Sequence, residues 1–260
     1  MSKTEQERHF VSIELFWRLH DRLPKQGPGS DESTRRALAL AAPIRESPRV
    51  LDMGCGPGRQ TLVLAADLGG QVTALDLIPP FLEEVTERVE AAGLSDRIEA
   101  RSGSMLGLPK DAFPDGSVDL IWAEGSIYNV GFDAGLADWR RLLAPAGRIA
   151  VSEVAWLVED PPADVRTFWE AHYSGIRPHE ENVRAVEAAG YRLLGDLVVP
   201  ENEWWDDYYT LIEARLDAVR DERDTDDWQE GVADGYEELE IVRTGLGSFG
   251  YVFYVMERVD

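Results

Sequence analysis

The chain has 260 residues, of which 44% are hydrophobic, and this is enough for one domain with a full core. Its 49 acidic and 26 basic residues give a net charge of -23, which disfavours nucleic acid, because phosphate binding depends on clustered Lys and Arg. No run approaches 18 apolar residues and the first residues lack a basic start before an apolar core, so neither a membrane span nor a secretion signal is expected. Cys55 is the only cysteine, which excludes an intrachain disulfide, and we expect a soluble, cytoplasmic protein.

Two helices are expected before the first strand. Residues 4–23 carry apolar side chains at helical spacing, and the segment "PKQGPGS" then breaks this helix. A second helix begins after a cap at Ser30 or Asp31 and stops at Pro43.

Strands and helices then alternate at short intervals. The apolar patterns predict strands over 49–54, 71–77, 96–103, 117–125 and 147–156, and helices over 59–68, 79–93 and 133–147. Such alternation gives right-handed crossovers and a parallel sheet covered on both faces. The predicted fold is therefore a doubly wound α/β sheet.

The rhythm changes after residue 154. Helices are expected over 163–173 and 180–190, strands over 191–199 and 248–258, and two helices rich in Trp and Tyr over the acidic stretch 200–244. We find no internal repeat and no low-complexity tract.

The segment "VLDMGCGPGRQT", residues 50–61, follows the first strand with three alternate glycines. A dinucleotide fingerprint reads G-x-G-x-x-G, whereas here the third glycine falls one residue early and Arg59 takes its place. Asp76 ends the second strand, where a doubly wound sheet presents a carboxylate to the hydroxyls of a ribose. The pattern therefore indicates a ligand with a ribose that needs no pyrophosphate cradle.

With these residues the sequence resembles a class I S-adenosylmethionine-dependent methyltransferase of the small-molecule branch, which includes the quinone-biosynthesis methyltransferases. The segments 26–34, 120–132 and 151–156 look like a bacterial and archaeal subgroup, from which Ala123 and Ser126 depart in place of serine and alanine. The resemblance implies a mostly parallel seven-stranded sheet with an antiparallel last strand and a helical cap. It divides the single domain into cap helices at 1–45, a cofactor-binding core at 46–155 and a substrate side at 156–260.

The resemblance also implies the residues that bind S-adenosylmethionine. Gly54, Cys55 and Gly56 would line its methionine part through their backbone, and Asp52 would organise the loop or meet the ammonium through water. Asp76 would bind the ribose.

Further contacts are implied beyond the glycine loop. Leu77 would press on the adenine, and Ser104 and Met105 match the place of an acid that contacts the adenine amino group. Ala123 and Glu124 would face the ammonium and the transferring methyl, and Gln26 would close over the methionine carboxylate.

Methyl transfer needs no nucleophilic residue and no metal, because the sulfonium already makes its methyl group electrophilic. A general base helps with a phenol, a protonated amine or an acidic carbon. The candidates are Glu124, Tyr128, His172 and His179, and Glu124 is preferred because it ends a central strand, where ligands of this fold collect.

The aromatic residues Trp156, Trp169, Trp204, Trp205, Tyr208 and Tyr209 form either a lid over an apolar or cationic acceptor or ordinary core.

Three functions stay open from the sequence. The leading one is a methyltransferase acting on a small molecule, followed by a nucleotide-dependent oxidoreductase and by a non-catalytic S-adenosylmethionine-binding protein. Neither nucleic acid nor a membrane is expected as a partner, and a homodimer is retained as one form of assembly.

Overall fold

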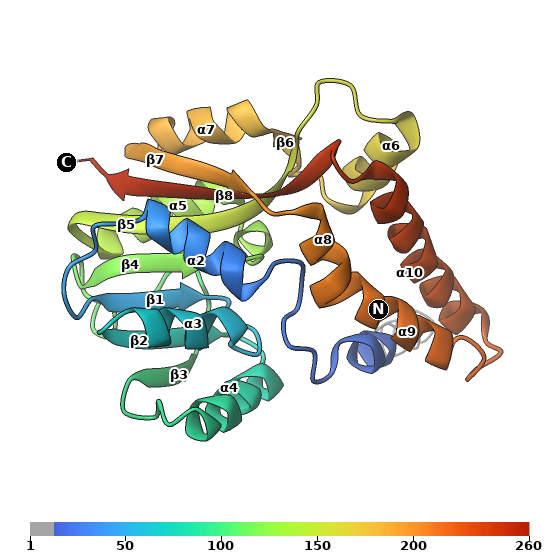
Figure 1. Ribbon diagram of the computed structural model, residues 1–260, viewed down its shortest axis with the longest axis horizontal. Helices are drawn as coiled ribbons and strands as arrows, with labels where there is room; N and C mark the ends of the chain where they lie inside the picture. Colours follow the sequence, from blue (N-terminus) through green and yellow to red (C-terminus); the bar gives the residue numbers. More distant parts are fainter. Residues whose placement is uncertain (1–12, 260) are drawn as a thin grey trace.

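A single twisted sheet organises the chain, whose computed structural model describes residues 13–259 (Figure 1). The strand order is β3-β2-β1-β4-β5-β8-β7, and a two-residue strand, β6, pairs with β5 off this path. The strands are β1 (Arg49–Met53), β2 (Gln71–Asp76), β3 (Ile98–Ser102), β4 (Val118–Ala123), β5 (Leu143–Trp156), β6 (Arg177–Pro178), β7 (Tyr191–Val198) and β8 (Phe249–Arg258). All neighbours pair in parallel except β8, which is antiparallel to both β5 and β7. The predicted doubly wound fold, with its antiparallel last strand, is confirmed.

Helices cover both faces of this sheet. One face carries α2 (Asp31–Leu40), α3 (Arg59–Asp67) and α4 (Pro79–Ala91), and the other carries α5 (Phe132–Trp139) and α7 (His179–Ala188). Side chains of β1 show why two layers form, because Val50 joins the core under α2 to α4 while Leu51 and Met53 join the core under α5 and α7. Because β2 and β4 both pair in parallel with β1, the carboxyl ends of these three strands lie together at one edge of the sheet.

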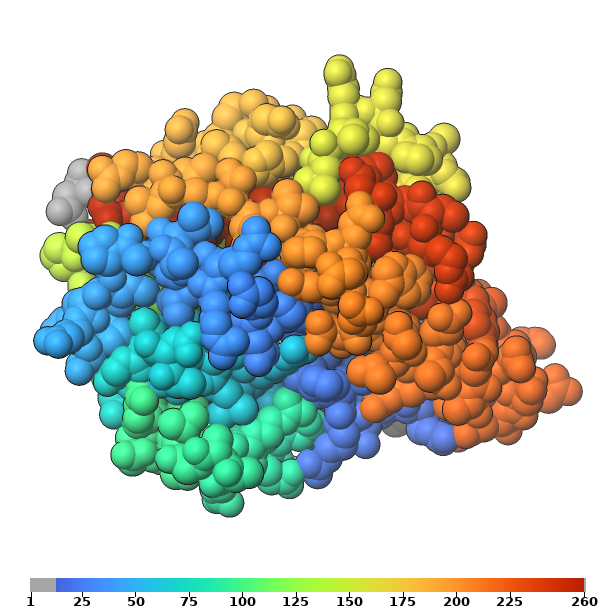
Figure 2. Space-filling view, viewed as in Figure 1, coloured from blue at the N-terminus to red at the C-terminus, as the bar shows by residue number. Residues whose placement is uncertain are grey.

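A helical cap lies beyond those carboxyl ends. It contains α6 (Ala163–His172), α8 (Glu201–Trp204), a π-helical turn (Trp205–Tyr209), α9 (Thr210–Val219) and α10 (Asp226–Gly245). Residues 13–20 are helical as well, and Figure 2 shows this blue N-terminal segment against the orange α9. Arg215 of α9 donates to the backbone oxygens of Leu19 and Asp21, which fixes the segment to the cap.

Most predicted elements are present, with differences at their ends. The helix expected over 4–23 is seen over 13–20, and its residues 4–12 lie outside the described part of the chain. Ser30, rather than Asp31, caps α2 by accepting a hydrogen bond from the Ser33 amide at 3.2 Å. The helix expected to reach residue 147 ends at Trp139, and β5 already begins at Leu143.

The cap and core contain no helix, over residues 13–259, that is long and apolar enough to cross a membrane.

Candidate active site

The glycine loop after β1 takes a shape that only glycine adopts readily. Gly54, Gly56 and Gly58 have φ angles of 69°, 53° and 84°, in the left-handed region that disfavours side chains. At Gly54 an added Cβ would also lie 2.6 Å from the Ser126 Cβ, and at Gly58 it would lie 2.8 Å from a Val85 methyl. The loop therefore passes close to the segment after β4 and to α4. Its glycines are required by the backbone conformation and close packing of the turn.

The amide groups of this loop are already used inside the protein. Gly54 and Cys55 both donate to the backbone oxygen of Leu75, at 2.8 and 3.0 Å. Gly56 donates to Asp76 Oδ2 at 2.8 Å, and the other carboxylate oxygen of Asp76 accepts from the Ile78 amide at 2.9 Å. A loop with its N–H groups taken offers a ligand carbonyl oxygens and carboxylate, which suits a cation better than a pyrophosphate.

Asp52 stabilises the loop from below. Its fully buried carboxylate accepts from Thr61 Oγ1 at 2.6 Å and from Gln60 Nε2 at 3.2 Å, and Gln60 also donates to the Cys55 carbonyl. Burial raises the pKa of Asp52 to about 7 against the opposing effect of these donors. Of the two roles that the resemblance implies for Asp52, the contacts match that of organising the loop.

A cavity of about 480 Å³ opens above the loop, and we name it the glycine-loop cavity. It is lined by Phe16, His20, Gln26, Gly54, Gly56, Asp76, Leu77, Ile78, Phe81, Gly103, Met105, Gly125, Ser126, Tyr128, Asn129 and Tyr208. The glycine loop, the segments that follow β2, β3 and β4, and the N-terminal segment therefore all line this cavity.

A second cavity of about 330 Å³ lies on the cap side, and we name it the aromatic cavity. It is lined by Gln26, Gly27, Pro28, Tyr128, Val154, Phe168, Trp169, His172, Tyr173, Trp204, Tyr208, Tyr209, Glu238 and Tyr251. Gln26, Tyr128 and Tyr208 belong to both cavities, so the two spaces meet at these side chains.

The structure brings many of the predicted residues to this pair of cavities and leaves others out. Those that line the glycine-loop cavity are Gln26, Gly54, Gly56, Asp76, Leu77 and Met105. Ser104 is exposed and is not in the lining, and its hydroxyl accepts from the Leu106 amide. Cys55 and Ala123 are buried under the surface, so Gly125 and Ser126 take the place expected for Ala123.

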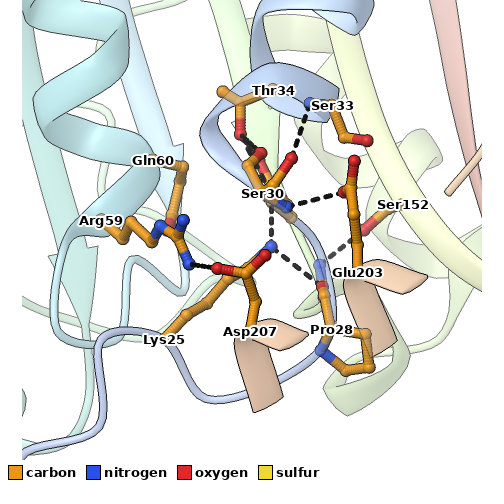
Figure 3. A network of polar contacts seen from close by, with 12 residues as sticks. Lys25, Pro28, Ser30, Ser33, Thr34, Arg59, Gln60, Ser152, Glu203 and Asp207 are labelled. Carbon is orange, nitrogen blue, oxygen red and sulfur yellow. Dashed lines mark hydrogen bonds and ion pairs between the residues drawn. The ribbon is translucent and has the colours of Figure 1, made fainter. Parts of the chain in front are cut away.

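Glu124 also points away from both cavities, contrary to the expectation that it faces the methyl group or acts as base. Its buried carboxylate forms an ion pair with Lys25 and accepts from Thr34 Oγ1 at 3.0 Å and Trp122 Nε1 at 2.9 Å. Figure 3 shows Lys25 and Thr34 as members of one network of polar contacts. No local pattern predicts this ion pair, because Lys25 and Glu124 lie 99 residues apart in the sequence. Its effect is to hold the loop that carries Gln26.

The same network joins the cap to the core (Figure 3). Glu203 of α8 accepts from the Ser30 amide at 2.8 Å. Arg59, which replaces the expected third glycine, binds Asp31 of α2 and Asp207 of the π-helical turn, each at 2.7 Å. Arg59 therefore sets the distance between the cap and the start of α3.

Two of the other candidate bases lie at the cavities and one does not. Tyr128 lines both of them, whereas His172 is exposed at the edge of the aromatic cavity with its Nδ1 at 2.8 Å from the Phe168 carbonyl. His179 contacts Tyr254 at 3.1 Å and is not in either lining.

His20 and Tyr208 form a pair that sequence reasoning did not identify. His20 Nδ1 lies 2.9 Å from the Phe16 carbonyl, which can only accept, so Nδ1 carries the proton and Nε2 accepts from the Tyr208 hydroxyl at 3.0 Å. Burial lowers the pKa of His20, which keeps the ring neutral. No periodicity indicates this pair, because its members are 188 residues apart and meet only when the cap folds back.

Glu153 is a second residue that the sequence analysis did not single out. It is 1% exposed on β5, and burial raises the pKa of its carboxyl to about 7 although the nearby Tyr173 hydroxyl favours the ionised form. Its Oε2 is buried and unpaired among the residues that the structure describes. The only available signal was a single acidic residue in the mostly apolar end of a predicted strand, residues 149–156.

Comparison with known proteins places this geometry in a family. Residues 50–147 match the model of a methyltransferase domain. The chain is 30% identical over 171 residues to a demethylmenaquinone methyltransferase of Thermus thermophilus, covering 63% of this chain and 71% of that protein. It is 32% identical over 151 residues, 56% of this chain, to a methyltransferase of Streptomyces halstedii.

The chain spans about half the length of the first curated relatives it matches, 53% for the Streptomyces protein and 56% for a 27-O-demethylrifamycin SV methyltransferase of Amycolatopsis mediterranei. Among solved structures, a methyltransferase from Geobacter sulfurreducens in complex with S-adenosyl-L-homocysteine superposes with a TM-score of 0.78 at 21% identity, over 94% of this chain and 97% of that one. This likeness confirms the fold. The chain belongs to the family of S-adenosylmethionine-dependent methyltransferases.

Proposed function

We propose that this protein transfers a methyl group from S-adenosylmethionine, held in the glycine-loop cavity, to a small molecule held in the aromatic cavity. One observation carries the proposal: the two cavities meet at Gln26, Tyr128 and Tyr208, so that molecules in the two spaces can touch. Cavities of about 480 and 330 Å³ suit a nucleoside-sized cofactor and a small acceptor.

The residues of the glycine-loop cavity fit this cofactor. Asp76 is 9% exposed in the lining, where its carboxylate can accept from ribose hydroxyls, and the exposed Leu77 offers an apolar surface for the adenine. Gln26 Oε1 is buried and unpaired within residues 13–259, so it is an acceptor in need of a donor such as an ammonium. When bound, S-adenosylmethionine supplies an electrophilic methyl carbon whose sulfur leaves as a neutral thioether.

The protein's own part is orientation and proton removal. The cap and the loop at 24–29 enclose the acceptor and exclude water, which competes for charged reactants. A proton released by the acceptor passes to Tyr208 Oη while Tyr208 gives its own proton to His20 Nε2. Tyr128 is placed to orient the acceptor, and His172 lies at the rim of the aromatic cavity.

A nucleotide-dependent oxidoreductase is a weaker alternative. Dinucleotide binding uses free loop amides for the pyrophosphate, whereas those of residues 54–56 are already bonded to Leu75 and Asp76.

Thermal unfolding with separate ligands tests the proposal. S-adenosylhomocysteine, S-adenosylmethionine and oxidised nicotinamide dinucleotide are added, each at about a hundredfold a plausible dissociation constant, where a true ligand adds roughly 2.7 kcal/mol. A shift of several degrees with the two adenosyl sulfur compounds alone is the expected result. A shift only with the dinucleotide, or none at all, would overturn the assignment of the cavity.

We further propose that the protein acts in the cytoplasm without nucleic acid or membrane, as a single domain divided at about residues 45 and 155. The net charge of -23 supports the absence of a polyanionic partner. A homodimer remains one proposed assembly, which sedimentation would test.

A further inference from the structure

The wall of the aromatic cavity combines ring faces with negative charge. Trp204 lies between two tyrosines, with ring centroids 5.2 Å from Tyr251 and 6.1 Å from Tyr209 and interplanar angles of 24° and 5°. Tyr208 stands nearly perpendicular to Tyr209, at 77° and 4.9 Å. Faces and edges meeting at right angles make a box in which a ligand contacts several π surfaces at once.

The charged groups at this box are carboxylates. Glu238 of α10 lines the cavity and accepts from the Tyr209 hydroxyl at 2.6 Å, which fixes both side chains at the wall. Buried Glu153 of β5 acts on Tyr173 of the lining, whose pKa is raised by burial and then by this carboxylate.

Among the described residues, no lysine or arginine lines the cavity. Arg177, which lowers the pKa of Glu153, is bonded to Asp133 and Asn182 and is absent from the lining. An anionic acceptor would therefore meet repulsion without a counter-charge, whereas a cation meets both carboxylate and ring faces.

Polar atoms in the same wall lack partners within the described part of the chain. The Nε1 atoms of Trp169 and Trp204 are buried and unpaired, as is Gln26 Oε1. Buried polar groups are normally satisfied, so the occupant should carry an oxygen that accepts from the indole N–H groups, whereas Gln26 Oε1 is left for the cofactor.

From these observations we propose that the aromatic cavity binds the methyl acceptor as a cationic amine, with its ammonium group against the tyrosine rings of the wall and Glu238 as counter-charge. This inference rests on the proposed function, because it names the class of acceptor. Phenols, carboxylates and phosphate esters are then poorer ligands of this cavity.

Choline and 3,3-dimethylbutan-1-ol test the charge directly, because they share a shape and a hydroxyl and differ in the positive nitrogen. Each is titrated into the protein saturated with S-adenosylhomocysteine, and binding is followed by saturation transfer to the ligand methyl protons. We expect choline to bind at least tenfold more tightly than the neutral alcohol, with its methyl signals shifted upfield by the rings. Equal affinity, preference for the alcohol or binding of neither probe would overturn the proposal.

Glu238→Gln and Glu237→Gln form a matched pair on α10. Glutamine still accepts from the Tyr209 hydroxyl, so Glu238→Gln should fold normally and lose about tenfold in choline affinity while the alcohol is unaffected. Glu237 is exposed and outside the lining, so Glu237→Gln should behave as the parent protein. An unchanged choline affinity in Glu238→Gln contradicts the proposal. Calorimetry of S-adenosylhomocysteine in the same samples separates this failure from failure of the proposed function.

Discussion

At the scale of single residues, Asp76 connects the glycine loop to the proposed cofactor site. Its two carboxylate oxygens accept from the amides of Gly56 and Ile78, so the side chain is held in one orientation before any ligand arrives. Hydrogen bonds to a charged group contribute about 1.5–3 kcal/mol each. We expect Asp76→Ala to weaken S-adenosylhomocysteine binding by roughly ten- to a hundredfold. Calorimetric titration measures this, and an affinity within threefold of the parent would remove Asp76 from the site.

Glu153 gives a pH-dependent prediction. Its pKa is about 7 in the folded protein and near 4.5 otherwise, so the unfolded chain releases this proton first as pH rises. The contribution of Glu153 to the free energy of unfolding is therefore fully present below pH 4.5 and is lost as the pH rises through about 7. Glu153→Gln removes the titration, so its free energy of unfolding relative to the parent should rise by up to ~3 kcal/mol between about pH 5 and pH 8.

Urea unfolding of both proteins at the two pH values measures this difference. The buried carboxyl of Asp52 titrates in the same direction, but it is present in both proteins and cancels. A difference in stability between the two proteins that does not change with pH would contradict the raised pKa of Glu153.

Single residues were predictable where their role is local. Gly54, Gly56 and Asp76 follow from the backbone of one βαβ unit, so their spacing along the chain predicts their position. Glu124 was placed correctly at the end of β4 but given the wrong surroundings, because its direction is set by Lys25, which nothing near β4 indicates. His20 was missed, and Tyr208 was named only as one of the aromatic residues, because the two pair across 188 residues of sequence.

At the scale of elements, a buried ion pair between Lys25 and Glu124 anchors the loop at 24–29. Lys25 also donates to the Pro28 carbonyl at 3.0 Å, so its ammonium group joins the loop to the end of β4. Removing one partner of a buried pair leaves an uncompensated charge and costs about 3–5 kcal/mol. We expect Lys25→Met to lower the free energy of unfolding by that amount.

The double variant Lys25→Met/Glu124→Gln is the control for this prediction. Glutamine keeps an acceptor for Thr34 and Trp122 and removes the charge, so the double variant should be more stable than Lys25→Met alone. Denaturant midpoints compare the three proteins. A Lys25→Met protein as stable as its parent would show that the pair does not secure the loop.

Element types were predicted better than element ends. The short apolar run in residues 49–54 and the helical period in residues 79–93 reflect burial in the sheet and against it, which depends little on the exact position of the neighbouring elements. By contrast, β5 extends back to Leu143 because it pairs with Val118 of β4, and the π-helical turn at Trp205–Tyr209 interrupts an otherwise helical pattern. Both features depend on tertiary contacts. The turn is nonetheless what brings Tyr208 and Tyr209 to the aromatic cavity, as π-bulges often do at functional sites.

At the scale of the whole molecule, negative charge opposes folding. The excess of 49 acidic over 26 basic residues means that repulsive pairs outnumber the surface ion pairs, which contribute little individually. Salt screens exposed charges beyond about 3 Å at 1 M. Raising KCl from about 0.05 to 1 M should therefore increase Tm by at least roughly 2–4 °C, the effect of about 1 kcal/mol in a protein of this size.

The isoelectric point provides the control. Near pH 4.5, where the net charge approaches zero, the same increase in KCl should leave Tm almost unchanged. A Tm at neutral pH that falls with KCl would mean that ion pairs such as Arg59–Asp207 outweigh the general repulsion.

The shared wall between the two cavities has a consequence for equilibrium binding. Any molecule in the glycine-loop cavity that shifts Gln26, Tyr128 or Tyr208 also alters the aromatic cavity. By reciprocity, the factor by which cofactor changes the affinity for acceptor equals the factor by which acceptor changes the affinity for cofactor. Under the proposed function, S-adenosylhomocysteine and the unmodified acceptor would therefore raise or lower each other's affinity by the same factor.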